Sequence, residues 1–144
     1  MRLPKFVNKK IESDELIEAA KAACGRAYAP YSNFRVGAAL VLDDGKIITG
    51  CNVENASYGL TICAERAAVF TAIAAGAKAI SCIAVAVESP TDDAASLMPC
   101  GACLQVLSEF MPPDGKILIA GNGEFALKDL LPNRFAIATR TKAI

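Results

Sequence analysis

The segment ICAERAAVFTAIAAGAKAISCIAVAV, residues 62–87, combines an apolar helix pattern with an apolar strand pattern. Residues 62–75 suit a helix that is apolar nearly all round, which predicts burial on several sides. Residues 79–87 form a continuous apolar run of strand length, and such a run is typical of a strand buried on both faces. A helix followed by a doubly buried strand favours an α/β fold.

Helical and extended patterns continue on both sides of this segment. Asp44 and Gly45 supply the turn of a hairpin between two strands. Helices that separate single apolar strands predict a three-layer α/β/α sandwich with a mixed sheet. We expect helices at about residues 14–26, 62–75, 99–111 and 127–131, and strands at about residues 34–42, 46–53, 79–87 and 116–120.

Composition restricts the chemistry that the chain can perform. Its 144 residues predict a single domain over residues 1–144, and 15 basic residues balance 15 acidic ones. A net charge of zero gives no electrostatic basis for binding a long nucleic acid or an anionic membrane. The sequence has no His, which excludes a Ser-His-Asp triad, a Cys-His dyad and a His-ligated metal. Any metal must be held by thiolates or carboxylates.

The N-terminal residues, MRLPKFVNKK, are basic but lack the apolar stretch of a secretory signal. No run approaches the roughly 20 apolar residues that a membrane-spanning helix needs. We therefore expect a cytoplasmic protein whose six cysteines stay reduced. In a reduced protein, metal binding or catalysis is a more frequent use of spaced cysteines than disulfide formation.

Three cysteines and a glutamate form the most informative pattern. Cys63 begins the second expected helix, two residues before Glu65. Cys100 and Cys103 form a CxxC motif, and Pro99 suits the first position of the third helix, so both thiols lie on one face of its first turn. Three thiolates leave one position open around a tetrahedral Zn²⁺, which is typical of catalytic zinc. We expect one Zn²⁺ per chain.

Two charged neighbours complete this pattern. Zn²⁺ with three thiolates carries a net negative charge, and Arg66 follows Cys63 by three residues, where its guanidinium can donate to a thiolate. Helix N-termini also stabilise thiolates. Glu65 is the carboxylate of the motif nearest the open position. We expect it to carry protons between a water molecule there and the substrate.

Other roles for these residues predict different properties. Cysteines can be ordinary small buried residues, as we expect for Cys24, Cys51 and Cys82. A closed structural zinc site would recruit Cys51 or Cys82 as its fourth ligand. A redox CxxC would leave Cys63 and Glu65 without a function. The two segments together favour a catalytic zinc centre.

At these residues the chain resembles the zinc-dependent cytidine deaminases, specifically the short-chain, all-cysteine and typically homotetrameric type. The resemblance extends from about Leu16 to Phe135. It rests on five segments: APYSNFRVGAAL at 29–40, GCNVEN at 50–55, TICAERA at 61–67, PCGAC at 99–103, and LLP at 130–132 followed by Phe135.

The resemblance implies a reaction and further roles. The reaction is the hydrolytic deamination of cytidine and 2′-deoxycytidine to uridine and 2′-deoxyuridine, with release of ammonia, in pyrimidine salvage. Asn52 and Glu54 are implied to bind the ribose hydroxyls, and residues i and i+2 of an extended segment do point the same way. Phe34 is implied to pack against the nucleoside. Phe135 is implied to stack on the base from a neighbouring subunit, so active sites would be shared within a homo-oligomer, and the family fold implies about five strands.

Two features depart from the family pattern. Leu104 stands where the family often has Arg directly after the second cysteine of the CxxC motif. This change removes a cation near the expected zinc and leaves more of the charge neutralisation to Arg66. Residues 136–144 do not resemble the family segment that follows Phe135.

Rival functions make different predictions. A deaminase of the same fold could act on another amine such as blasticidin S, although Asn52 and Glu54 favour a plain nucleoside. A polynucleotide deaminase agrees poorly with a net charge of zero. A non-catalytic, zinc-stabilised binding protein would have a closed four-ligand site and no turnover.

Overall fold

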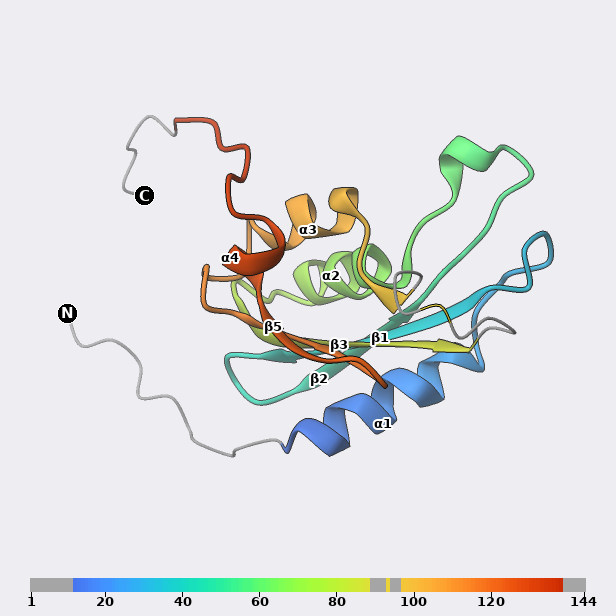
Figure 1. The fold of residues 1–144 in the computed structure, drawn as a ribbon, viewed down its shortest axis with the longest axis horizontal. Helices are drawn as coiled ribbons and strands as arrows, with labels where there is room; N and C mark the ends of the chain where they lie inside the picture. The colour runs from blue at the N-terminus through green and yellow to red at the C-terminus, as the bar shows by residue number, and fades with distance from the viewer. Residues whose placement is uncertain (1–11, 89–92, 94–96, 139–144) are drawn as a thin grey trace.

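The chain folds into one mixed sheet of five strands between two layers of helices (Figure 1). The structure is a computed structural model and describes residues 12–88, 93 and 97–138. In chain order the elements are α1 (Ser13–Cys24), β1 (Arg35–Leu42), β2 (Ile47–Cys51), the 3₁₀ turn η1 (Tyr58–Leu60), α2 (Ala64–Ala74), β3 (Ile80–Glu88), α3 (Gly101–Leu107), β4 (Lys116–Ile119), β5 (Gly123–Ala126) and α4 (Leu127–Leu130).

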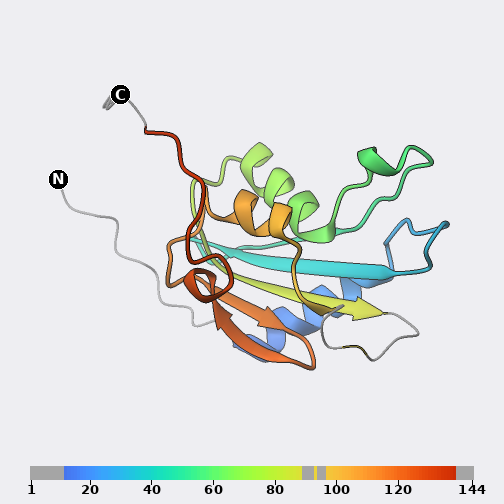
Figure 2. The same cartoon turned by 45° about the horizontal axis from the view of Figure 1, so that its top comes forward.

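The sheet has the strand order β2-β1-β3-β4-β5. β1 is antiparallel to both β2 and β3, β3 is parallel to β4, and β4 is antiparallel to β5. α2, α3 and α4 lie on the opposite side of the sheet from α1, as Figures 1 and 2 show. This arrangement confirms the three-layer α/β/α sandwich predicted from the sequence.

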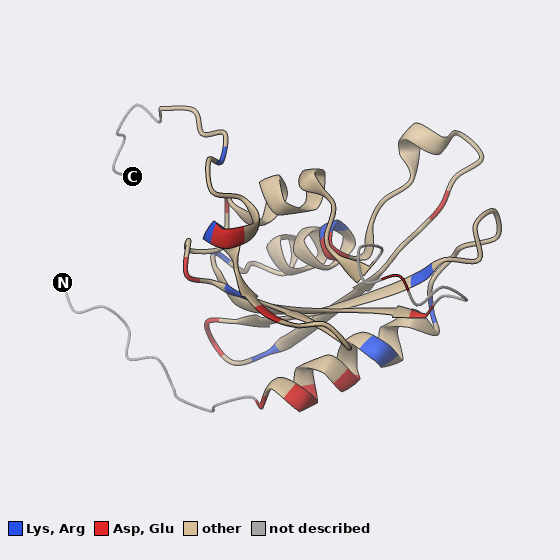
Figure 3. Ribbon diagram, viewed as in Figure 1, with Lys and Arg blue, Asp and Glu red and all other residues tan. Residues whose placement is uncertain are grey.

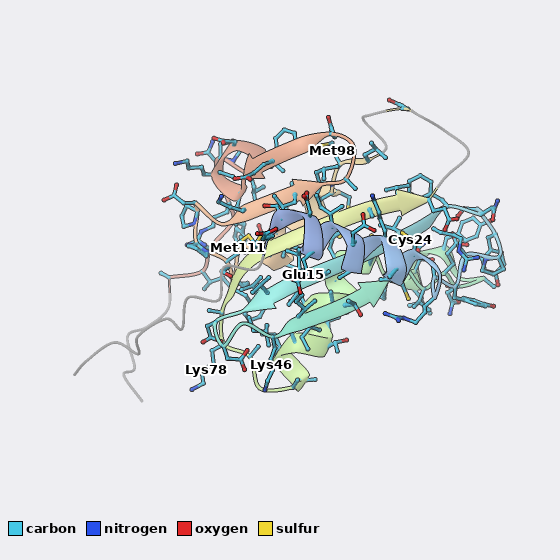
Figure 4. All side chains as sticks on the ribbon, turned by 90° about the horizontal axis from the view of Figure 1, so that it is seen from below. Glu15, Cys24, Lys46, Lys78, Met98 and Met111 are labelled. Carbon is cyan, nitrogen blue, oxygen red and sulfur yellow. The ribbon has the colours of Figure 1, made fainter. Side chains whose placement is uncertain are left out.

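Each face of the sheet has its own hydrophobic core. On one face, Leu16 and Ala20 of α1 pack with Ala39, Ala84 and other small residues of the central strands. Figure 4 views this face, with Glu15 and Cys24 marking the two ends of α1. On the other face, buried residues of α2 and α3 pack with those of β1, β3 and β4. Small side chains bring α1 close to the sheet.

Two glycines allow the helices to approach the strands closely. A Cβ atom at Gly37 of β1 would lie 2.0 Å from the carbonyl oxygen of Ala20, and one at Gly50 of β2 would lie 2.4 Å from the amide nitrogen of Ala68. Real Cβ atoms do not come so near to backbone atoms, so only glycine fits at either position. The contact at Gly50 sets the position of α2 against the sheet.

The expected helices and strands are all present, with two additions, β5 and the 3₁₀ turn η1, and one correction. β5 was not expected, and the helix predicted at 99–111 is the shorter α3. Cys100, with φ −72° and ψ 162°, is the N-cap of α3, so Pro99 precedes the helix instead of occupying its first position. We also expect residues 88–98 to form a loop from the sequence, and most of them lie outside the described residues.

Charged residues are distributed over many elements of the molecule. Figure 3 shows acidic and basic positions interspersed along α1, the strands and the loops. Four ion pairs are present among the described residues, and all eight side chains in them are substantially exposed. Within the described part of the chain, no helix is both long enough and apolar enough to cross a bilayer.

Candidate active site

Two helix N-termini bring the three predicted thiols together. Cys63 is the N-cap of α2 and Cys100 is the N-cap of α3, while Cys103 lies in the first turn of α3. The Sγ atoms of Cys63 and Cys100 are 4.0 Å apart, and those of Cys100 and Cys103 are 3.5 Å apart. All three sulfur atoms lie within 4.8 Å of one another.

This spacing fits a zinc ion. Tetrahedral Zn²⁺ with Zn–S bonds of about 2.3 Å requires sulfur atoms about 3.8 Å apart, whereas a disulfide requires about 2.05 Å. All six cysteines are free. Cys51 and Cys82 do not belong to the group, and Cys51 donates instead to the carbonyl of Arg26. Among the described residues, the donor set therefore has three members, which suits an open site better than a closed structural one.

Arg66 supplies positive charge to the thiol cluster. Its Nη2 donates to Cys63 Sγ at 3.3 Å, and its Nε is buried without a hydrogen-bond partner among the described residues. The hydrogen bond from Cys103, helped by the Arg66 guanidinium, lowers the pKa of Cys63 to about 5. The pKa of Cys103 is raised, first by its hydrogen bond to Cys63 and then by burial. Negative charge in the cluster is therefore favoured at Cys63.

Leu104 places an apolar side chain at the position directly after Cys103. Its side chain is buried and belongs to the hydrophobic core between α2, α3 and the sheet. The position after Cys103 thus faces apolar surroundings, and among the described residues Arg66 is the cation that donates to the cluster.

Glu65 is a buried carboxylic acid beside the cluster. It lies in the first turn of α2 with only 5% of its surface exposed. Burial raises the pKa of Glu65 to about 6. A carboxyl group with a pKa near neutrality can both accept and donate a proton under ordinary conditions.

A cavity of about 250 Å³ joins the thiols and Glu65 to the predicted nucleoside-binding residues. This volume is close to the lower end of the range for small-molecule sites, about 300 Å³. Polar and apolar side chains share its surface. The cavity is lined by Ser32, Phe34, Val36, Asn52, Glu54, Thr61, Cys63, Ala64, Glu65, Val85, Val87, Leu97, Met98 and Cys100.

Asn52 is held by the backbone at the start of β1. Its Oδ1 accepts a hydrogen bond from Val36 N at 2.8 Å, and its Nδ2 donates to Phe34 O at 2.7 Å. Because one partner is a donor and the other an acceptor, the orientation of the amide group is fixed. Asn52 is 7% exposed, and it lies among the lining residues together with Phe34.

Phe135 lies outside this cavity. Its side chain is 70% exposed and is absent from the lining. Gln105 of α3 holds its backbone: Gln105 Nε2 donates to Phe135 O at 2.9 Å, and Phe135 N donates to Gln105 Oε1 at 3.3 Å. The chain therefore presents this aromatic ring outward.

Sequence reasoning did not assign several lining residues. Ser32 stands inside the quoted segment 29–40, so its polar side chain was a usable signal. Leu97 and Met98 directly precede the PCGAC segment, and their place in the chain was the only signal. Gln105, two residues after Cys103, does not line the cavity, and no sequence signal indicated its contact with Phe135.

Known proteins share this sequence and fold. The sequence description "Cytidine and deoxycytidylate deaminase zinc-binding region" matches residues 10–120. A cytidine deaminase from Halalkalibacterium halodurans is 46% identical over 125 residues, which covers 83% of this chain and 91% of that protein. The crystal structure of cytidine deaminase from Burkholderia pseudomallei is 50% identical, with a TM-score of 0.78, and the match covers 87% of this chain and 100% of that one.

A protein with a different named substrate is more distant. Blasticidin-S deaminase from Bacillus cereus is 31% identical over 129 residues, covering 84% of this chain and 90% of that protein.

Proposed function

The chain belongs to the cytidine and deoxycytidylate deaminase family, and we propose that it hydrolyses cytidine and 2′-deoxycytidine to uridine and 2′-deoxyuridine with release of ammonia. One observation carries this proposal. A buried glutamate and thiols from two helix N-termini line the same cavity, whose volume of about 250 Å³ suits a small ligand.

Cys63, Cys100 and Cys103 are the residues that would hold the family's zinc ion. When bound, zinc acts as a Lewis acid that makes a water molecule more acidic and more nucleophilic. The Arg66 guanidinium donates to Cys63 Sγ and offsets part of the negative charge of three thiolates. These roles are supported by the sulfur spacing and by the position of Arg66.

Glu65 would move the protons of the reaction. Its carboxylate would take a proton from the attacking water and deliver that proton to N3 of the pyrimidine ring. It would then assist protonation of the amino group on C4, which leaves as ammonia. Burial suits Glu65 to both transfers, because a buried carboxyl group binds a proton more readily than an exposed one.

The other end of the nucleoside requires polar and aromatic partners. Glu54 and Asn52 line the cavity with hydrogen-bonding groups suited to ribose hydroxyls, and Phe34 provides an apolar surface. The fixed orientation of Asn52 supports this assignment, because a site that is already arranged loses less entropy on binding.

We also propose that the protein forms a homo-oligomer, as a tetramer in which Phe135 enters the site of a neighbouring copy. Several large apolar side chains are exposed, including Tyr58 at 77%, Leu60 at 65%, Phe70 at 50% and Phe135 at 70%. Exposed apolar surface of this kind is typical of interfaces. Phe135 cannot serve the cavity of its own chain in the observed position, since it does not line it.

A cytoplasmic role in pyrimidine salvage agrees with the thiol chemistry. Zinc requires deprotonated, unoxidised cysteines, and a reducing compartment preserves them. All six cysteines are free in the structure.

The direct test follows the ultraviolet absorbance of cytidine in the presence of the purified protein, with blasticidin S as a competing substrate. We expect conversion of cytidine and 2′-deoxycytidine to uridine and 2′-deoxyuridine, with one ammonia released for each. Preferential turnover of blasticidin S would overturn the substrate assignment. No turnover of any amine by a sample that holds one zinc per chain would instead support a non-catalytic zinc protein.

A further inference from the structure

The carboxylate of Glu54 is already occupied by the loop that precedes β1. Its Oε1 accepts hydrogen bonds from the amide nitrogens of Tyr31 at 3.0 Å and Ser32 at 3.2 Å. Its Oε2 accepts a hydrogen bond from Ser32 Oγ at 2.5 Å. Ser32 therefore contacts both oxygen atoms of the carboxylate, and both residues line the cavity.

Counting lone pairs shows what this arrangement leaves for a ligand. A carboxylate has about four acceptor positions, and two on Oε1 and one on Oε2 are used by the loop. One acceptor remains on Glu54 Oε2. Asn52 keeps one donor on Nδ2 and one acceptor on Oδ1, because each atom uses a single position on the backbone of Phe34 or Val36. Together these groups suit a hydroxyl that donates to Glu54 and accepts from Asn52.

Ser32 determines where the free acceptor of Glu54 points. Two hydrogen bonds from backbone amides hold Glu54 Oε1 in place. The hydrogen bond from Ser32 Oγ to Oε2 then prevents the carboxylate from rotating about Oε1. Ser32 Oγ is itself fixed, since it accepts a hydrogen bond from Phe34 N at 2.9 Å. The hydrogen bond from Ser32 also lowers the pKa of Glu54, which keeps the carboxylate ionised.

We propose that Ser32 is a positioning residue that orients the Glu54 carboxylate toward a 2′- or 3′-hydroxyl of the sugar and thereby sets the preference for nucleosides that carry one. The proposal rests on the proposed function, because it assigns a task to a residue of the same cavity. The chemistry is hydrogen bonding alone, with no covalent step. Ser32 acts through Glu54 and has no part in proton transfer at the ring.

The loop has other attachments that do not need the serine hydroxyl. Tyr28 N donates to Asn52 O at 3.0 Å, Glu54 N donates to Tyr28 O at 2.8 Å, and Asn33 N donates to Ala29 O at 3.0 Å. Ser32→Ala therefore removes two hydrogen bonds, the one that the hydroxyl donates to Glu54 and the one that it accepts from Phe34 N, and leaves these backbone bonds in place. We expect this variant to fold and to keep its zinc.

The test compares cytidine with 2′,3′-dideoxycytidine, which lacks the 2′- and 3′-hydroxyls of the sugar. For Ser32→Ala, the KM for cytidine should rise about tenfold, which is the size expected for a lost hydrogen bond to a charged group. Its kcat should stay within about twofold. The competition constant of 2′,3′-dideoxycytidine against cytidine turnover should not change, because that analogue has no 2′- or 3′-hydroxyl for Glu54 to bind.

Three further variants sharpen this test. Ser32→Thr keeps a hydroxyl and should restore the preference for cytidine. In a Glu54→Gln background, Ser32→Ala should not raise the KM for cytidine further, since the two residues act as a unit. Ser81→Ala, which removes an exposed hydroxyl that bonds to Val41 O on β1, is the matched control and should leave both constants unchanged.

Two results would overturn the proposal. An unchanged KM for cytidine in Ser32→Ala would show that the hydroxyl does not orient Glu54. An equal weakening of the binding of cytidine and of 2′,3′-dideoxycytidine would assign the effect to Phe34, which Ser32 also contacts. Failure of the proposed function is a separate outcome, because the unaltered protein would then convert no cytidine.

Discussion

Among single residues, the buried carboxyl group of Glu65 is the one on which the proposed reaction depends most. A carboxyl group that is 5% exposed is costly to keep charged, and its pKa is raised to about 6 by that burial. A structural protein gains little from such a group. Beside three thiols and a cavity, the same group is available for proton transfer.

Replacing Glu65 should separate metal binding from turnover. We expect Glu65→Gln to keep one zinc per chain, because the glutamate is not among the grouped donor atoms. Its kcat for cytidine should fall at least about 100-fold, since an amide cannot carry the proton. Metal analysis and steady-state kinetics on the same sample measure both. Loss of zinc in step with activity would show that Glu65 has a structural task, and full activity would refute its role in proton transfer.

The sequence indicated the thiol cluster better than it indicated the polar residues that line the rest of the cavity. The pattern of Cys63, Cys100 and Cys103 favoured a shared ligand, and the structure brings their sulfur atoms within 4.8 Å of one another. Ser32 was quoted within a motif but given no role. Its task depends on the carboxylate of Glu54, which lies 22 residues away and approaches only after folding.

At the scale of elements, the long apolar segments were the easiest to predict. The helix expected at 62–75 and the strand expected at 79–87 correspond to α2 and β3, with ends shifted by one or two residues. Their apolar composition identifies them, and β3 is buried along its centre, whereas the buried residues of α2 lie on one side of the helix instead of the several sides expected. The contact between α2 and β2 through Gly50 could not be predicted, because it depends on tertiary packing.

Short elements were predicted less well. β5 has only four residues, including Gly123 and Glu124, and forms an edge strand beside β4. Gly and Glu have low strand propensity, so the pairing with β4 is what stabilises this strand. The helix expected at 99–111 ends at Leu107, and Arg134 Nη1 donates to the carbonyl of Ser108 just beyond that end. Long-range contacts of this kind leave no local signal.

Over the whole molecule, the exposure of several large apolar side chains is the feature that a single chain does not explain. α2 was expected to be buried on several sides, yet Phe70 on this helix is half exposed in the single chain. A partner copy would cover it. The same assembly would give Phe135 a site to enter.

Mixing two inactive or weakened variants tests the shared active site. Phe135→Ala should raise the KM for cytidine about tenfold, in line with the loss of one aromatic–base stacking contact. Co-assembly with Glu65→Ala should recover low-KM activity, because some sites then combine an intact Glu65 with a partner's intact phenylalanine. Light scattering should show an oligomer throughout. A fully active monomer, or no recovery in verified mixed oligomers, would contradict the arrangement.

The dependence of cytidine turnover on zinc tests the proposed zinc-dependent deamination most directly. Zinc would be removed with a chelator and returned in steps while the conversion of cytidine to uridine is followed. Activity should be lost with the metal, rise in proportion to added zinc, and stop rising at one equivalent per chain. Cytidine turnover that persists without zinc, or a fully loaded protein that converts no cytidine, would contradict this proposal.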